Sequence, residues 1–287
     1  MNTTGNRQPT PPACWSKSAT QNAWWVRLSK TPENVLMLDY DGTLAPFRVD
    51  RMSASPYPGV VERLERLLQL GNSKIVLVSG RPVSELRKLF PFADKVDLWA
   101  SHGREHRTPS GDYTLYELTP DQTALLNKIE SDLASAFLPP SSIERKPANL
   151  AIHWRGLEPE EQETIRDRVL NRYRSLSQNA SIELMPFEDG LEFRALGRTK
   201  ADVVRAVLAN LQEDGMAAYL GDDRTDEDAF GAMRSGDLAL LVRDSPRATL
   251  ADYWLAPPEE LLAFLNQWIA AATNRVNAPL AATGTSA

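Results

Sequence analysis

The chain is poor in cysteine and histidine. Its 287 residues include one cysteine, Cys14, and three histidines. A single cysteine excludes an intrachain disulfide and a structural zinc site built on thiolates. It is typical of a protein kept in a reducing compartment, so we expect a cytoplasmic location.

Positive charge and long hydrophobic runs are also scarce. The 32 Lys and Arg residues are outnumbered by 38 Asp and Glu residues, which gives a formal net charge of −6. No run of basic residues supplies a local patch, so we expect no nucleic-acid partner. No segment reaches the roughly 18 apolar residues of a membrane helix, and residues 1–20 lack the apolar centre of a signal peptide. We therefore expect a soluble protein without a membrane partner. The sequence indicates no particular oligomeric state.

Hydrophobic residues nevertheless make up 42% of the chain, enough for a sizeable core. Short continuous apolar runs, such as residues 35–38 and 75–78, alternate with stretches of helical period. This alternation is typical of a parallel sheet wrapped by helices. The sequence thus predicts an α/β protein with a doubly wound, Rossmann-like parallel sheet.

The middle of the chain has a different pattern. Residues 150–154 and 191–195 alternate apolar and polar side chains, which predicts an antiparallel sheet with one face covered by helices. We interpret this region as a smaller α/β domain inserted into the first. The predicted segments are a disordered tail (1–23), a core domain in two parts (24–106 and 196–272), the inserted cap domain (107–195) and a second disordered tail (273–287).

Two carboxylates follow the first buried strand, in the string Asp39-Tyr40-Asp41-Gly42-Thr43. Asp39 and Asp41 are two residues apart, so in an extended chain they point to one side, at the sheet edge where ligands bind. Both carboxylates can be ionised at a low cost in free energy only beside a cation such as Mg²⁺. One would then be free to act as nucleophile and the other to exchange a proton with a leaving group. The alternative is an ordinary turn in which Gly42 supplies the bend.

Two further signals lie where helices begin. Ser79, Gly80 and Arg81 follow a buried strand, and Pro82 opens a helix, so a hydroxyl and free N–H groups could hold a phosphate. Ser79 could equally be a plain helix cap. Lys200 stands at the start of an amphipathic helix, where the helix dipole opposes its charge and favours a nearby anion. The alternative is a solvated lysine.

An acidic cluster follows the apolar run 217–220. It contains Asp222, Asp223, Asp226, Glu227 and Asp228. Such oxygens are ligands for a hard cation. The last three could instead favour the first turn of a helix, an explanation that does not cover the first two.

All four signals fall at strand ends or helix starts, in the order carboxylate pair, serine, lysine and acidic cluster, which makes coincidence improbable. This order resembles the haloacid dehalogenase superfamily of Mg²⁺-dependent phosphotransferases, over residues 24–105 and 196–272. The resemblance implies a hydrolase core with an aspartyl-phosphate intermediate. The implied catalytic residues are Asp39, Asp41, Ser79 and Lys200. The implied phosphate-binding residues are Gly42, Thr43, Ser79, Gly80 and Lys200. The implied Mg²⁺ ligands are Asp39, the main-chain carbonyl of Asp41 and Asp222, supported by Asp223 and Asp226.

Strings in the inserted segment narrow the resemblance to the trehalose-6-phosphate phosphatase family. They are Ser-His-Gly-Arg-Glu at 101–105, Glu-Arg-Lys at 144–146, His-Trp-Arg at 153–155 and Glu-Phe-Arg at 192–194. In that family, cap residues grip the sugar hydroxyls, and the matching positions are Glu144, Lys146, Arg155 and Glu192. Ser101, Ala195 and Ala201 depart from residues common in the family. Other sugar phosphates therefore stay open as substrates, namely those of sucrose, mannosylglycerate and glucosylglycerol.

The cap residues can also be interpreted without the resemblance. Glu144 and Lys146 are two apart, so they share a strand face opposite the apolar one, and such a face suits a polyhydroxylated ligand. The alternative is a solvated face with cross-strand ion pairs. A sugar-phosphate sensor without activity is a further class. It would be expected to lack one of the four implied catalytic residues, and all are present.

Overall fold

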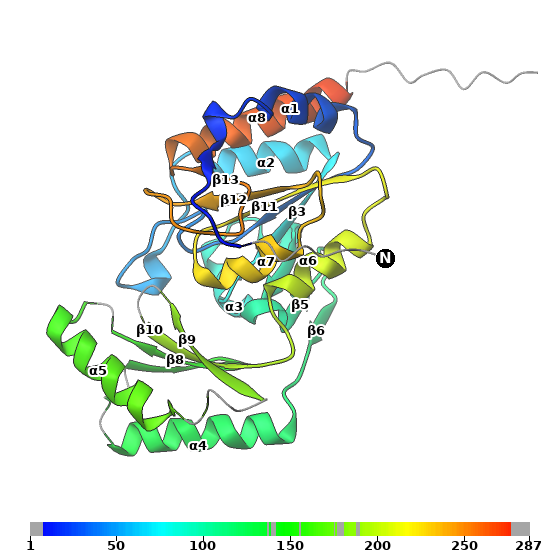
Figure 1. Cartoon of the computed structure of the whole chain (residues 1–287). Helices are drawn as coiled ribbons and strands as arrows, with labels where there is room; N and C mark the ends of the chain where they lie inside the picture. Colours follow the sequence, from blue (N-terminus) through cyan, green and yellow to red (C-terminus); the bar gives the residue numbers. More distant parts are fainter. Residues whose placement is uncertain are drawn as a thin grey trace, which may run out of the picture.

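The larger part of the chain is built on a nine-stranded sheet (Figure 1). The computed structural model describes residues 8–136, 138, 142–154, 156–174, 176, 181–187 and 190–276. Along the sheet, the strands are β1 (Ala13–Cys14), β13 (Tyr253–Leu255), β12 (Leu238–Val242), β11 (Met216–Gly221), β2 (Asn34–Leu38), β3 (Ser73–Val78), β4 (Asp97–Ala100), β5 (Glu105–Arg107) and β6 (Tyr113–Leu115). Pairing is parallel from β1 to β4, and antiparallel from β4 through β5 to β6. The predicted parallel α/β sheet is confirmed, with an antiparallel edge.

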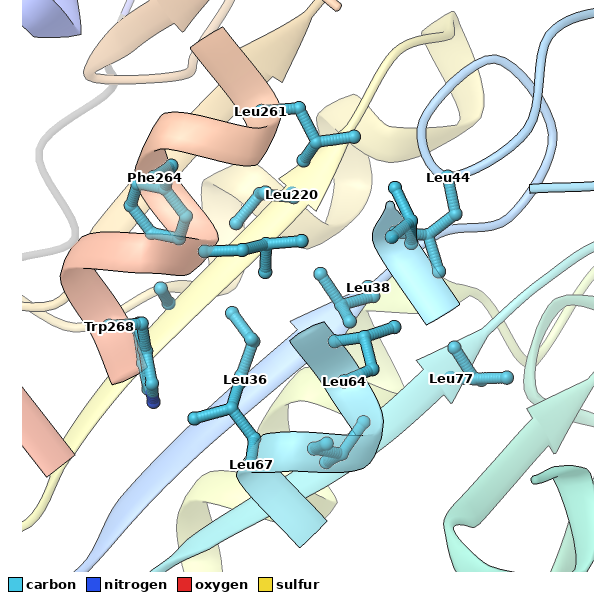
Figure 2. Close-up of a cluster of buried hydrophobic side chains, with 14 of the residues drawn as sticks. Leu36, Leu38, Leu44, Leu64, Leu67, Leu77, Leu220, Leu261, Phe264 and Trp268 are labelled. Carbon is cyan, nitrogen blue, oxygen red and sulfur yellow. The ribbon is translucent and has the colours of Figure 1, made fainter. Parts of the chain in front are cut away.

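Helices cover both faces of this sheet because successive strand side chains point to opposite sides. From β2, Leu36 and Leu38 pack toward one face, while Val35 and Met37 pack toward the other. The first face carries α1 (Gln21–Lys30), α2 (Val60–Leu70), α3 (Val83–Leu89) and α8 (Glu259–Val276). The second carries α6 (Lys200–Ala209) and α7 (Glu227–Ala232). Figure 2 shows the first face, where leucines of β2, β3 and β11 meet side chains of α2 and α8.

A four-stranded antiparallel sheet forms the smaller part, in the order β7-β8-β10-β9. Its strands are β7 (Ile143–Arg145), β8 (Asn149–His153), β9 (Ile182–Phe187) and β10 (Gly190–Ala195). One face packs on α4 (Pro120–Ala136) and α5 (Pro159–Arg172) through an apolar cluster. In Figure 1 these helices lie on the side of the small sheet that is away from the large sheet. The predicted one-sided antiparallel sheet is confirmed, and its polar face is turned toward the rest of the molecule.

The structure differs from the predicted borders at three places. Residues 13–23, placed in a disordered tail, contain β1 and the start of α1, because buried Trp15 packs against Trp24 and Tyr253. Helix α8 continues to Val276, beyond the predicted end of the core. Strand β6 pairs with β5 although it lies beyond residue 107.

Two chain crossings join the sheets, and Arg104 contacts both. Its guanidinium donates to the carbonyls of Tyr116 and Glu117 on the outward crossing, and to those of Ala195 and Leu196 on the return. We propose that the chain changes domain at these crossings, and we call the part built on the large sheet the core and the part built on the small sheet the cap. Within the described residues, no helix has the length and apolar composition needed to cross a membrane.

Candidate active site

The predicted catalytic residues meet at one edge of the large sheet. Strand β2 lies between β3 and β11, and all three run parallel. Asp39 follows β2, Ser79 follows β3 and Asp222 follows β11. Because the carboxyl ends of parallel strands share an edge, residues far apart in sequence come together there. They line a single pocket, together with Lys200.

Three buried carboxylates form the centre of this pocket. Asp39, Asp222 and Asp226 each contribute an oxygen, and these oxygens lie within 4.8 Å of one another. The Oδ2 atom of Asp222 is buried, with no hydrogen-bond partner within the described part of the chain. A set of carboxylate oxygens with an unused acceptor fits a hard cation such as Mg²⁺.

Lys200 places its ammonium group among these carboxylates. Its Nζ lies 2.8 Å from Asp39 Oδ1 and 2.7 Å from Asp226 Oδ1. Thr199 caps α6 by accepting a hydrogen bond from the N–H of Ala201, which fixes Lys200 in the first turn. Lys200 is 2% exposed. The expected anion is therefore confirmed, and the solvated alternative is wrong.

The pKa shifts show that the pocket holds excess negative charge. Burial raises the pKa of Asp39 to about 7, although Lys200 opposes the rise. Burial, together with Asp39 and Asp226, raises the pKa of Asp222 well above its usual value. Burial lowers the pKa of Lys200, but the two carboxylates that it contacts raise it more. One ammonium among three carboxylates leaves charge that a divalent cation would balance.

Asp41 lies apart from this cluster because Arg81 holds it. The Nε atom of Arg81 lies 2.5 Å from Asp41 Oδ2, and Nη2 lies 2.6 Å from Oδ1. Arg81 also donates to Glu85 at 3.0 Å and is 3% exposed. This two-point contact fixes the orientation of the Asp41 carboxylate at the pocket wall.

Of the five residues predicted to hold the metal, three, Asp39, Asp222 and Asp226, have carboxylate oxygens that lie together. The Asp41 side chain is outside the group, in keeping with a role for its main-chain carbonyl alone. Asp223 is also outside it, and its backbone N–H donates to Asp226 Oδ2 at 3.1 Å. Helix α7 is preceded by a short 3₁₀ turn (Arg224–Asp226), and the capping box of this turn joins Asp223 to Asp226. Asp226 is thus turned inward by the local fold.

Gly42 is required by close approach of the backbone to Asp222. Its φ is +81°, and a Cβ atom there would lie 2.1 Å from Asp222 Oδ2. The resemblance implies that Gly42 binds phosphate. In the structure its N–H instead donates to the Ala45 carbonyl at 2.7 Å, where the chain turns back. Thr43 is fully buried, and its hydroxyl has no partner among the described residues.

Ser79 and Gly80 form the turn between β3 and α3, which we call the phosphate turn. The Ser79 hydroxyl is buried and accepts a hydrogen bond from the Arg81 N–H at 3.2 Å. Pro82, not Ser79, is the cap residue of α3, so the plain-cap alternative is wrong. Both Ser79 and Gly80 line the pocket.

The cap contributes Lys146 and Glu192 to the same pocket. Glu192 is 4% exposed and accepts hydrogen bonds from Asn149 at 3.1 Å and Lys146 at 3.5 Å. Burial opposes its ionisation, but His102 and Lys146 hold the pKa of Glu192 below its usual range. Glu192 is therefore buried between cap and core, whereas Lys146 beside it is partly exposed, and the cross-strand ion pairs of the alternative interpretation are present.

Glu144 lies beside this pocket and has three basic partners. It pairs with Arg51 of the core, with His153 at 2.7 Å and with Lys146 at 3.9 Å. Burial again opposes ionisation, and His153 and Arg51 lower the pKa of Glu144 below its usual range. Arg155, the fourth predicted sugar ligand, lies outside the described residues.

The predicted site residues did not include five polar residues of the pocket wall: Arg51, Arg81, His102, His153 and Thr225. Arg81 and His102 stand inside strings that were singled out, so their neighbours were a usable signal. Arg51 belongs to a short 3₁₀ turn in the loop after β2, and its sequence surroundings give no such signal.

Solved structures of other proteins share this fold. A haloacid dehalogenase-like hydrolase from B. subtilis has a TM-score of 0.57, with 14% identity over 81% of this chain and 98% of that chain. The C-terminal domain of C. albicans trehalose-6-phosphate phosphatase has a TM-score of 0.77, with 20% identity over 93% of this chain and 99% of that chain. The chain therefore has the α/β fold of the haloacid dehalogenase-like hydrolases, with a cap.

The sequence identifies the family within this fold. The family model described as trehalose-phosphatase matches residues 37–255, so the chain belongs to the trehalose-phosphatase family. A trehalose-phosphate phosphatase from Mycobacterium marinum is 27% identical over 248 residues, which cover 81% of this chain. The chain spans 60% of the length of that relative.

Proposed function

We propose that the protein is a Mg²⁺-dependent phosphatase that hydrolyses trehalose 6-phosphate to trehalose and phosphate. Membership of the trehalose-phosphatase family supports this reaction. The observation that carries it is the composition of one pocket, in which the core carboxylates face Lys146 and Glu192 of the cap. A phosphate and a sugar in the same molecule can reach both groups at once.

The phosphoryl half of the proposal rests on core residues. Asp39 attacks phosphorus and forms an aspartyl-phosphate while the bond to the sugar oxygen breaks. Asp41, oriented by Arg81, protonates that oxygen and afterwards takes a proton from the water that cleaves the intermediate. Ser79, Lys200 and the Thr43 N–H hold the phosphoryl oxygens.

The buried carboxylates Asp39, Asp222 and Asp226, with the main-chain carbonyl of Asp41, would hold Mg²⁺. When bound, the ion supplies the positive charge that lets a phosphate dianion enter an anionic pocket. Asp223 keeps a supporting role through its contact with Asp226.

The sugar half rests on Glu144, Lys146 and Glu192, with Arg155 added from the family pattern. The side chains of Glu144, Lys146 and Glu192 already form ion pairs with one another and with core residues. Sugar hydroxyls can replace part of these contacts with hydrogen bonds to the same fixed groups. The cap is then the part that distinguishes one sugar from another.

Two alternatives keep the same pocket. The chemistry could act on the phosphate of sucrose, mannosylglycerate or glucosylglycerol, since the cap face is suited to polyols in general. A sensor without activity is disfavoured because Asp39, Asp41, Ser79 and Lys200 all line the pocket. The single cysteine supports a reducing compartment such as the cytoplasm.

A phosphate-release assay over a panel of sugar phosphates, with Mg²⁺, tests the proposal. We expect the highest kcat/KM for trehalose 6-phosphate. A higher value for another sugar phosphate would replace the substrate and keep the chemistry. No release from any member of the panel would favour the sensor.

A further inference from the structure

The backbone at His102 adopts a conformation that side-chain-bearing residues avoid. Its φ is +54°, and φ of the preceding Ser101 is +50°. Two consecutive left-handed residues that are not glycine store strain, which persists only where surrounding contacts enforce it. Here the Ser101 N–H donates to the Arg81 carbonyl at 2.9 Å, and the His102 N–H donates to the Ser79 carbonyl at 3.0 Å. The strained pair is therefore tied to the phosphate turn.

The strain directs the imidazole of His102 to the border between core and cap. The residue is 6% exposed, and its Nε2 lies 3.4 Å from Glu192 Oε2 of the cap. Its other flank lies on the phosphate turn, where a Cβ atom added to Gly80 would be 2.6 Å from Nε2. One ring thus contacts the phosphate side and the sugar side of the same pocket.

Glu192 is held from two directions as a result. Its Oε1 accepts from Asn149 and Lys146, both on the cap. Its Oε2 faces His102, which belongs to the core. Without His102, the carboxylate would keep its cap partners and lose its link to the phosphate turn.

We propose that His102 is a positioning residue for substrate selection: it acts through Glu192 and fixes the sugar-binding face at a set distance from the phosphate turn. This inference rests on the proposed function and assigns the core a part in reading the sugar. A substrate with both a sugar and a phosphate needs that distance to be right. A small aryl phosphate does not engage Glu192, so it is indifferent to the distance.

Three variants separate the effect of losing the imidazole ring of His102 from the effect of relieving its backbone strain. His102→Ala removes the ring and keeps a side chain at the left-handed position. His102→Gly removes the ring and relieves the strain, because glycine adopts positive φ freely. His102→Gln places an amide N–H about where Nε2 lies and so restores a donor toward Glu192. The quantity measured is kcat/KM for trehalose 6-phosphate divided by kcat/KM for p-nitrophenyl phosphate.

We expect this ratio to fall about tenfold or more in His102→Ala and His102→Gly, since a charge-assisted contact is lost in both. It should recover in part in His102→Gln. The Gly variant should have a higher Tm than the Ala variant, while their ratios stay alike. A ratio unchanged in the Ala and Gly variants would overturn the inference, as would a Gly variant with the wild-type ratio, since strain alone would then matter.

His106 provides the matched control. It pairs with Asp97 at 2.6 Å and stacks on Trp99, away from the pocket wall. His106→Ala should change both activities by the same factor and leave the ratio intact. A fall of the ratio equal to that of His102→Ala would mean that general loosening of the core is the cause, and would also overturn the inference.

The wild-type measurements keep the two proposals apart. If wild type prefers another sugar phosphate, the proposed substrate fails, and the His102 variants are judged with the preferred one. If wild type prefers trehalose 6-phosphate and the variants keep its ratio, the inference about His102 fails alone.

Discussion

The core and the cap both place acidic side chains at or beside the same pocket, yet the shifts of their pKa values are opposite. Burial raises the pKa of Asp39 to about 7 and raises that of Asp222 well above its usual value. Basic partners hold the pKa of Glu144 and Glu192 low despite burial. Asp39 and Glu192 are buried to the same degree, at 4% exposed, so the difference between these two lies in their partners.

Each cap carboxylate has basic partners within the chain, and a lysine or an arginine is among them in both cases. Glu144 pairs with Arg51, His153 and Lys146, and Glu192 faces His102 and Lys146. The core cluster has Lys200 among three carboxylates. The cap is thus prepared for a ligand without net charge, such as a sugar, and the core for one that brings a cation.

The largest expected effect is that of Asp39→Asn, which removes the nucleophile from the core cluster. An amide cannot accept the phosphoryl group, so kcat should fall by at least about 10³. A phosphate-release assay measures it, with Tm as the control for folding. If the folded variant kept a tenth of wild-type kcat, only about 1.4 kcal/mol would be lost, and another group would be the nucleophile.

Removal of Mg²⁺ should also affect the core and spare the cap. With EDTA we expect phosphate release to stop, and addition of Mg²⁺ should raise Tm because the ion binds the folded state alone. The Tm increase should survive Lys146→Ala and be lost in Asp222→Asn, a pair that contrasts cap and core. Full activity in metal-stripped buffer would show that the excess charge of the core has another purpose.

Substitutions in the cap should weaken recognition of the sugar and leave the hydrolysis of the phosphate ester intact. Glu144→Ala or Lys146→Ala should lower kcat/KM for trehalose 6-phosphate by about 10², because sugar hydroxyls and the remaining charged partners are left unpaired. Hydrolysis of p-nitrophenyl phosphate should stay near the wild-type value. Equal losses on both substrates would mean that these residues only hold the cap together.

A fall in pH should produce the smallest of these effects. It should change the stability of the cap and of the core in opposite directions. The lowered pKa values of Glu144 and Glu192 give stability that is present above about pH 4.5 and is lost as the pH falls below it, on the order of 1 kcal/mol each. The raised pKa of Asp39 has the reverse sign: without metal, the fold gains stability as pH falls from about 7 toward 4. Hydrogen exchange, corrected for intrinsic rates, should show cap strands losing protection between pH 5 and 3 while β2 keeps it.

Much of the core site could be predicted from sequence because strand ends in a parallel sheet share an edge. Asp39, Ser79 and Asp222 each follow an apolar run, and the parallel topology brings the ends of these three strands to one edge. Side-chain direction was not predictable in the same way. Asp41 turns to Arg81, and Asp226 turns inward through its capping box, so the carboxylates that lie together differ from the string of acidic residues.

The cap and the chain start show a second limit. Arg51 contacts Glu144 across the domain border, and Trp15 packs on Tyr253, so both contacts join residues remote in sequence. Periodicity describes one element at a time and carries no information about such pairs. A polar segment with isolated aromatics, as at residues 8–20, therefore resembled a tail until its partners were known.

One buried residue, Arg104, links both crossings between core and cap. Arg104 is 5% exposed, and its four hydrogen bonds divide evenly between the outgoing and the returning chain. A rotation of the cap that preserves these bonds has its pivot at this guanidinium, and a small turn there becomes a larger displacement at the distant end of the cap. Loss of the Arg104 side chain would therefore loosen the outgoing and the returning chain at the same time.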